Sequence, residues 1–181
     1  ICINGANAVE VGEPLGVDRV IFLHVKYHGM DVAIQTTVEI ILWEGSFMVH
    51  ERFTPADILE LRTRYPGLHV LAHPECPPDV LAEADYVGST SGMSRFVRES
   101  GLKQIALITE CSMSANIAAL NPEVNIVRPC QMCPHMQRIT LDNIIASLEL
   151  DQFEITVPED IQIRAKRAID RMLEVAVGAR G

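Results

Sequence analysis

The segment 73–78, with the sequence HPECPP, has the residue types of a catalytic or metal-binding loop. His73 and Glu75 are two residues apart in a stretch whose prolines favour extended backbone, so their side chains are expected to project to the same side. A histidine beside a carboxylate suits proton transfer or ligation of a metal-bound substrate. The alternative is a histidine at a strand end that only hydrogen-bonds a loop.

A second candidate segment, 88–92 with the sequence GSTSG, precedes a stretch of helical periodicity over 93–99. Its backbone N–H groups, the hydroxyls of Ser89 and Thr90 and the helix N-terminus together favour an anion such as a carboxylate or a phosphate. An ordinary Ser or Thr N-cap, with glycines for the turn, explains the same residues without a ligand.

Two of the five cysteines, Cys130 and Cys133, form a Cys-x-x-Cys motif that His135 follows. Such motifs occur in redox disulfides, in zinc half-sites and in iron–sulfur ligation, but here no second Cys-x-x-Cys completes a four-cysteine zinc site. An odd number of widely spaced cysteines indicates a reducing compartment, by default the cytoplasm. The remaining cysteines are expected to be small core residues: Cys2, Cys76 and Cys111.

The other histidines give weaker signals. The segment 50–53, with the sequence HERF, lies just before an expected helix start and is interpreted as structural. His24 and His28 flank a turn near Lys26, and their spacing predicts no particular chemistry.

Short runs rich in Val and Ile alternate with segments of helical period, which is typical of parallel sheets with crossover helices. The sequence therefore predicts an α/β fold. Because ligands of open α/β sheets bind at the carboxyl ends of the strands, the polar segments 73–78, 88–92 and 110–112 are expected to converge on one crevice. The expected strands are 19–24, 39–43, 69–72, 86–87, 104–109, 125–127 and 154–157.

Helix starts are indicated by Thr54 with Pro55, by the sequence PPD at 77–79 and by PED at 158–160. In the last helix, apolar residues recur at three- and four-residue steps and form one face that should bury against a partner. They are Ile161, Ala165, Ala168, Ile169, Met172, Leu173 and Ala176.

The composition limits the classes of function. The 181 residues are 48% hydrophobic and 22% charged, which is typical of a folded globular protein. Acidic residues outnumber basic ones by 24 to 15 without any basic cluster, so neither nucleic acid nor an anionic membrane is an expected partner. No apolar run approaches the roughly 20 residues that cross a bilayer. The chain opens at Ile1 with no targeting signal, and we expect a fragment whose N-terminal part is missing.

Taken in order, the motifs resemble one family, quinolinate synthase, the enzyme of de novo NAD biosynthesis. HPECPP at 73–78, GSTSGM at 88–93 and CPHM at 133–136 are jointly specific. The resemblance covers nearly the whole chain. Shorter matches are ANAVEV at 6–11, IILW at 40–43, VHERFT at 49–54, TE at 109–110 and TL at 140–141.

The resemblance implies a transferase that condenses iminoaspartate with dihydroxyacetone phosphate to quinolinate, with loss of phosphate and water. It also implies three similar αβα domains around a [4Fe–4S] cluster that three cysteines hold and whose open iron acts as a Lewis acid. Two of these domains are expected here, over 1–45 and 46–128. The segment 129–181 would carry the loop of a cluster cysteine and helices that return to the missing first domain. Small anionic substrates are the implied partners.

Carried over residue by residue, the resemblance makes Cys133 the third cluster cysteine. His73 and Glu75 match the active-site histidine and glutamate, with Glu75 handling protons and His73 hydrogen-bonding substrate oxygen atoms. Ser89 and Thr90 match the hydroxyl loop that binds substrate.

Some positions depart from the family pattern. Phe47 stands where the family has its second cluster cysteine, three residues before His50, and a phenyl ring cannot ligate iron. The sequence KYH at 26–28 replaces a loop containing Asp and Lys. Further departures are Asn4-Gly5 in place of Thr-Ser and Gln137 in place of Lys.

Three hypotheses therefore stay open. In the first, the protein is a quinolinate synthase in which Cys76 or Cys130 replaces the missing thiolate. In the second, it is a homologue or fragment without a cluster that binds small anions. In the third, it is a thiol or zinc protein in which Cys130 and Cys133 act as a pair with His135 or Cys111.

Overall fold

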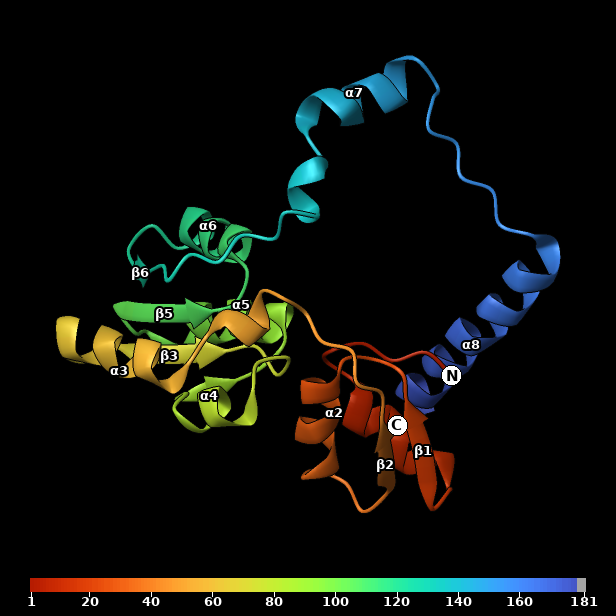
Figure 1. Cartoon of the computed structure of the whole chain (residues 1–181), viewed down its shortest axis with the longest axis horizontal. Coiled ribbons are helices and arrows are strands. Elements are labelled where there is room, and N and C mark those ends of the chain that lie inside the picture. The colour runs from red at the N-terminus through yellow and green to blue at the C-terminus, as the bar shows by residue number, and fades with distance from the viewer. Residues whose placement is uncertain (179–181) are drawn as a thin grey trace. The chain divides into compact units, whose positions relative to one another are not determined.

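The computed structural model describes residues 1–178, which form two compact units (Figure 1). The larger unit is Asn4–Met132, and the smaller unit joins Ile1–Ile3 to the chain from Cys133 onward. The predicted division at residues 45 and 128 stays a prediction.

A parallel four-stranded sheet forms the centre of the larger unit. Its strand order is β4-β3-β5-β6, with β3 at His69–Ala72, β4 at Tyr86–Val87, β5 at Gln104–Ile108 and β6 at Asn125–Val127. The chain leaves β3 toward β4 and then crosses back to β5 on the other side, so the connection changes direction between β3 and β5. Open α/β sheets bind ligands at the carboxyl ends of the strands at such a point.

A second, two-stranded parallel sheet pairs β1, Arg19–Phe22, with β2, Glu39–Leu42. The crossover helix α2, Lys26–Ala33, connects the two strands, and its Gly29 packs tightly against them. A Cβ at Gly29 would overlap Leu42 Cδ2 and would lie 3.0 Å from Phe22 Cδ1, so only glycine lets α2 approach this closely. This sheet follows the short helix α1, Ala8–Gly12, and the 3-10 turn η1, Glu13–Leu15.

The helices around the larger sheet begin at the predicted signals. Helix α3, Pro55–Arg64, opens with a capping box between Thr54 and Asp57, and α4, Pro78–Ala82, follows the proline pair. Helix α5, Thr90–Ser100, has Ser89 as its N-cap, and α6, Cys111–Leu120, has Glu110. Figure 1 shows α4 below β3 and α6 above β5. The remaining short element is η2, His50–Arg52.

The core lies where α5 and α6 cover the sheet. Strands β3 and β5 are near-continuously apolar because parallel strands are buried on both faces. The buried cluster consists of Leu71, Met93, Val97, Ile105, Leu107, Ile117 and Val124. The α/β prediction and six of the seven predicted strands are confirmed, although β1, β2 and β5 end one or two residues early.

The smaller unit contains the turn η3, Met136–Arg138, and the helices α7, Leu141–Glu149, and α8, Glu159–Gly178. The predicted strand at 154–157 is wrong: this segment is exposed and irregular, and no described strand pairs with it. Most of the described side chains on the apolar face of α8 are exposed, among them Ile161, Ile169 and Leu173, and burial of this face against a partner stays a prediction. Ala176 belonged to that prediction, and its side chain lies outside the described ones.

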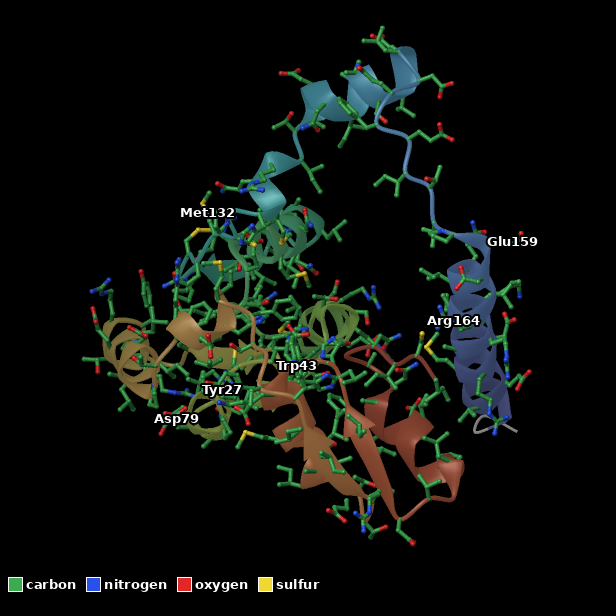
Figure 2. The ribbon with its side chains drawn as sticks, turned by 45° about the vertical axis from the view of Figure 1, so that its right-hand side comes forward. Tyr27, Trp43, Asp79, Met132, Glu159 and Arg164 are labelled. Atoms are coloured by element: carbon green, nitrogen blue, oxygen red, sulfur yellow. A yellow bond between two sulfur atoms is a disulfide. The ribbon has the colours of Figure 1, made fainter. Side chains whose placement is uncertain are left out.

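Ion pairs along α8 stabilise this exposed helix (Figure 2). Its side chains, among them Glu159 and Arg164, project from the helix on all sides. Arg164 pairs with Asp160 at 3.0 Å and Lys166 with Asp170 at 2.6 Å, both at a spacing of four residues. Such pairs stabilise an exposed helix by a few tenths of a kcal/mol each, about 0.3–0.5.

None of the helices in residues 1–178 is long and apolar enough to span a membrane. A cytoplasmic location stays a prediction.

Candidate active site

The loop after β3 holds His73 and Glu75 by backbone hydrogen bonds. The His73 N–H donates to the Ile108 carbonyl at the end of β5 (3.2 Å), and the Cys76 N–H donates to the His73 carbonyl (2.9 Å). Both side chains are buried, with 7% and 8% exposed. The loop therefore keeps two polar side chains inside the protein at the carboxyl end of the central strands.

Four histidines surround the Glu75 carboxylate and together with it form the histidine cluster. Oε1 lies 3.7 Å from His24 Nε2, while Oε2 lies 3.2 Å from His50 Nδ1 and 3.5 Å from His73 Nδ1. The fourth histidine, His28, places its Nδ1 3.2 Å from Nδ1 of His24. Oε1 thus faces His24, which contacts His28, and Oε2 faces His50 and His73.

Within the histidine cluster, His28 and His73 are neutral imidazoles at pH 7. Burial lowers the pKa of both His28 and His73 to about 4. Burial by itself would raise the pKa of Glu75, but its contact with His50 and the attraction of His73, His50 and His24 outweigh burial and lower it. Glu75 is therefore ionised and able to accept a proton.

Nδ1 of His50 is a buried polar atom without a hydrogen-bond partner among the described side chains. It lies close to Glu75 Oε2, yet it is off the direction of a hydrogen bond, so we regard this contact as electrostatic only. Its other nitrogen, Nε2, lies 3.2 Å from the Thr109 hydroxyl, which fixes the ring.

Sequence reasoning assigned chemistry to His73 and Glu75 and missed the three other histidines. It treated His50 as structural and gave His24 and His28 no role. The spacing of four residues between His24 and His28 is the sequence signal that could have identified this pair, because it places two imidazoles together at the start of a helix.

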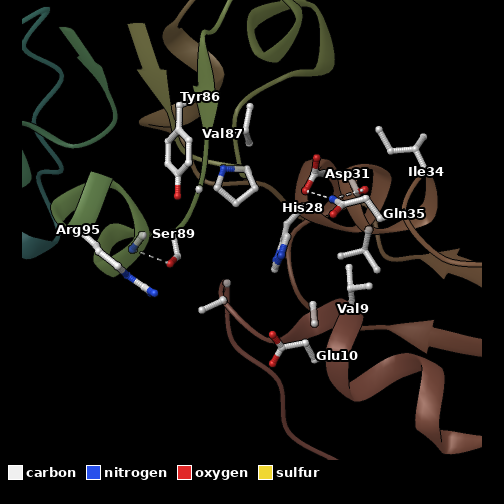
Figure 3. A pocket seen from close by; sticks show the side chains of 17 residues that line it. Val9, Glu10, His28, Asp31, Ile34, Gln35, Tyr86, Val87, Ser89 and Arg95 are labelled. Carbon is white, nitrogen blue, oxygen red and sulfur yellow. Dashed lines mark hydrogen bonds between the residues drawn. The ribbon is translucent and has the colours of Figure 1, made fainter. Parts of the chain in front are cut away.

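A cavity of about 570 Å³ lies within the larger unit, beside α5 and α2 (Figure 3). Ser89 and Arg95 of the α5 region form one wall, and His28 stands on another with Glu10 below it. The Ser89 hydroxyl accepts from the Gly92 N–H at 3.2 Å, so it caps α5 and borders the cavity at the same time. Arg95 brings a positive charge that sequence reasoning did not single out.

The predicted site residues are only partly brought together. His73 reaches the cavity wall near Gly5, where a Cβ would lie 3.9 Å from His73 Nε2 and 4.0 Å from Ser89 Cβ. Ser89 borders the cavity and Thr90 is the first residue of α5, whereas Cys133 belongs to the smaller unit. The loop after β3 and the segment 88–92 therefore both contribute to one region of the larger unit.

The cysteines differ from the sequence prediction. Cys111 forms a disulfide with Cys130, because the loop after β5 runs beside residue 131: the Cys111 N–H donates to the Gln131 carbonyl at 3.0 Å. Cys111 is therefore not the plain core thiol that the sequence predicts, and the hypothesis of a Cys130–Cys133 pair is not supported, since Cys130 is bonded to Cys111. Cys76 is a core residue as predicted, with nothing exposed.

Residues 1–174 match the protein-family model described as Quinolinate synthetase A protein. The chain belongs to this family. It is 53% identical to quinolinate synthase 2 of Mesorhizobium japonicum over 97% of this chain and 54% of the relative. It is 49% identical to quinolinate synthase of Xylella fastidiosa over 97% of this chain and 52% of the relative, and 46% identical to that of Caulobacter vibrioides over 97% and 49%. The chain therefore spans about half the length of the curated relatives that it matches.

The quinolinate synthases use a [4Fe–4S] cluster, and the described residues of this chain do not fit one. The larger unit has a phenyl ring at position 47, whose centroid lies 6.2 Å from that of His24 and 6.3 Å from that of His50. Burial raises the pKa of the Cys76 thiol to about 12, so it is not available as a thiolate, and the sulfur of Cys130 is in a disulfide. Neither proposed substitute can therefore complete the ligand set.

Proposed function

We propose that this chain carries the substrate-binding part of a quinolinate synthase, an enzyme that condenses iminoaspartate with dihydroxyacetone phosphate to quinolinate with loss of phosphate and water. The cavity with Arg95 and Ser89 on one wall is the observation that carries this proposal. Both substrates are anions, and a guanidinium beside a hydroxyl is a strong recognition site for a carboxylate or a phosphate.

The two walls of the cavity suit the two ends of iminoaspartate. A carboxylate would bind at Arg95 and Ser89, whereas the Glu10 carboxylate could accept a hydrogen bond from the imine N–H. A positive charge on one wall and a hydrogen-bond acceptor on the other would orient the substrate. The Glu10 carboxylate also disfavours nearby binding of an anion that lacks an N–H group.

Glu75 and His73 are the groups that would act on protons. The ionised Glu75 is the general base, and the neutral His73 holds a substrate oxygen by a hydrogen bond. The buried loop after β3 holds both side chains in place before substrate arrives, which is the requirement for orienting a reaction. We derive no step through the cluster, because the described residues do not fit it.

Binding of dihydroxyacetone phosphate and of quinolinate, measured by calorimetry, tests the proposal. Arg95→Gln is expected to weaken binding by about 10- to 100-fold, the worth of a charge-assisted hydrogen bond. Arg98→Gln removes the same charge from the same helix, where Arg98 is exposed beside Glu99, and should change affinity less than about twofold. Equal effects of the two substitutions, or no binding of either probe, would overturn the assignment of the cavity.

A further inference from the structure

The histidine cluster contains a set of side chains with the chemistry of a metal site. One ligating atom each from His24, His28 and Glu75 can be chosen so that all three lie within 4.8 Å of one another. Around a tetrahedral Zn²⁺ with bonds of about 2.0–2.2 Å, neighbouring ligand atoms lie roughly 3.4 Å apart. His24 Nε2 lies 3.7 Å from Glu75 Oε1. The hydrogen bond between the Nδ1 atoms of His24 and His28, 3.2 Å long, positions the two rings next to each other.

We propose that His24, His28 and Glu75 bind one divalent transition-metal ion, with Zn²⁺ as the reference ion. Two imidazoles and one carboxylate form the donor set that zinc and ferrous iron share in proteins, and it leaves coordination positions open. His28 also lines the cavity, so an open position would lie beside the space in which a small anion can bind.

The two carboxylate oxygens of Glu75 have different roles at the metal site. Oε1 faces His24 and is the ligand, whereas Oε2, which lies 3.2 Å from His50 Nδ1 and 3.5 Å from His73 Nδ1, stays free to accept a proton. His50 Nδ1 has no hydrogen-bond partner among the described side chains, so its contact with Oε2 is electrostatic only.

The alternative set of His50, His73 and Glu75 is less suitable, although its atoms are as close together. The rings of His50 and His73 are stacked, with an interplanar angle of 10° and centroids 5.0 Å apart. The lone pair of an imidazole nitrogen lies in the ring plane, so two parallel rings direct their lone pairs side by side and not at one ion. By contrast, the rings of His24 and His28 meet at 82°.

The local structure holds the two histidine ligands and leaves a way in for the ion. The Phe22 ring lies edge-on to both imidazoles, with centroids 6.2 Å from His24 and 5.5 Å from His28. Gly29 fixes the start of α2 by its close packing on β1 and β2. The side chain of His24 is 28% exposed, so an ion can reach the site from solvent.

Titration of the metal-stripped chain with Co²⁺, a spectroscopic substitute for Zn²⁺, tests the proposal without any activity assay. We expect one equivalent to bind, with the visible spectrum of nitrogen and oxygen ligands and without a thiolate charge-transfer band. His24→Leu and His28→Leu should each weaken binding by at least about tenfold. His135→Leu, which removes a histidine of the smaller unit, should leave binding unchanged.

The half-exposed His24 keeps the test valid if the buried His28 proves necessary for folding. The proposal is overturned by unchanged affinity in His24→Leu, or by a thiolate band that assigns the ion to cysteines. It is equally overturned if His50→Leu abolishes binding while His24→Leu does not, because the ion then lies between the stacked rings. If Arg95→Gln does not weaken anion binding, the proposed function fails, but the metal-binding result is not affected.

Discussion

Acidification from pH 8 to pH 5 is expected to destabilise the larger unit through His28 and His73. Each imidazole has a pKa near 6.5 when unfolded and about 4 when folded. The unfolded chain therefore takes up protons as the pH falls below 6.5, whereas the folded protein stays unprotonated until about pH 4. Stability is full above pH 6.5 and is lost between these two values.

The size of the effect follows from the two pKa values. A base with pKa values of 6.5 and about 4 in the two states lowers the free energy of unfolding at pH 5 by about 2 kcal/mol relative to pH 8. His28→Leu removes one such base, so the loss on acidification should be about 2 kcal/mol smaller in this variant than in the parent. Glu75, whose pKa is lowered, remains ionised at pH 5 and does not oppose this change.

Urea titrations at pH 8 and pH 5, with a chelator present, measure both quantities. Trp43 is the one tryptophan of the chain and lies directly after β2, so its fluorescence reports on the larger unit (Figure 2). The comparison uses the change between the two pH values in each protein, and it is therefore independent of any constant effect of the leucine. An equal loss of stability in parent and variant would refute the reasoning that His28 is buried as a neutral imidazole.

Three further predictions follow from the same structure. We expect a fusion of this chain, carrying Phe47→Cys, with the unmatched part of the Mesorhizobium japonicum relative to bind about four iron and four acid-labile sulfide and to form quinolinate. The same fusion with Phe47 should do neither. A cluster in both fusions would contradict the conclusion that the described residues do not fit a [4Fe–4S] cluster. Iodoacetamide at pH 8 should label Cys2 but not Cys76 in the native protein, as read by peptide mass spectrometry, because Cys76 is buried and its pKa is raised to about 12. Gly29→Ala should lower the free energy of unfolding by about 1–3 kcal/mol through overlap with the β2 side chains, whereas Gly12→Ala, which has open space, should not; equal urea midpoints would contradict this.

The sequence predicted those parts of the fold that local patterns control. Thr54 with Pro55 marked the start of α3, because an N-cap and a proline at N1 act within one helical turn. Strands β3 and β5 were predicted because both faces of a central parallel strand are buried, which leaves a continuous apolar run. The segment 154–157 has a strand-like pattern too, but a strand also needs a neighbour, and no described segment pairs with it.

The candidate site shows the same difference between what local patterns predict and what tertiary contacts decide. The sequence by itself determined that His73, Glu75 and Ser89 follow strands of one parallel sheet, since strand ends are visible in the apolar pattern and their carboxyl ends meet at one edge. Only the tertiary structure decided that His24, His28 and His50 surround Glu75, and that Cys130 pairs with Cys111 and not with Cys133. These contacts join segments that are 19–51 residues apart, and the folding of α2, β3 and β5 against one another sets such distances. No local spacing records the contacts with Glu75 or the disulfide.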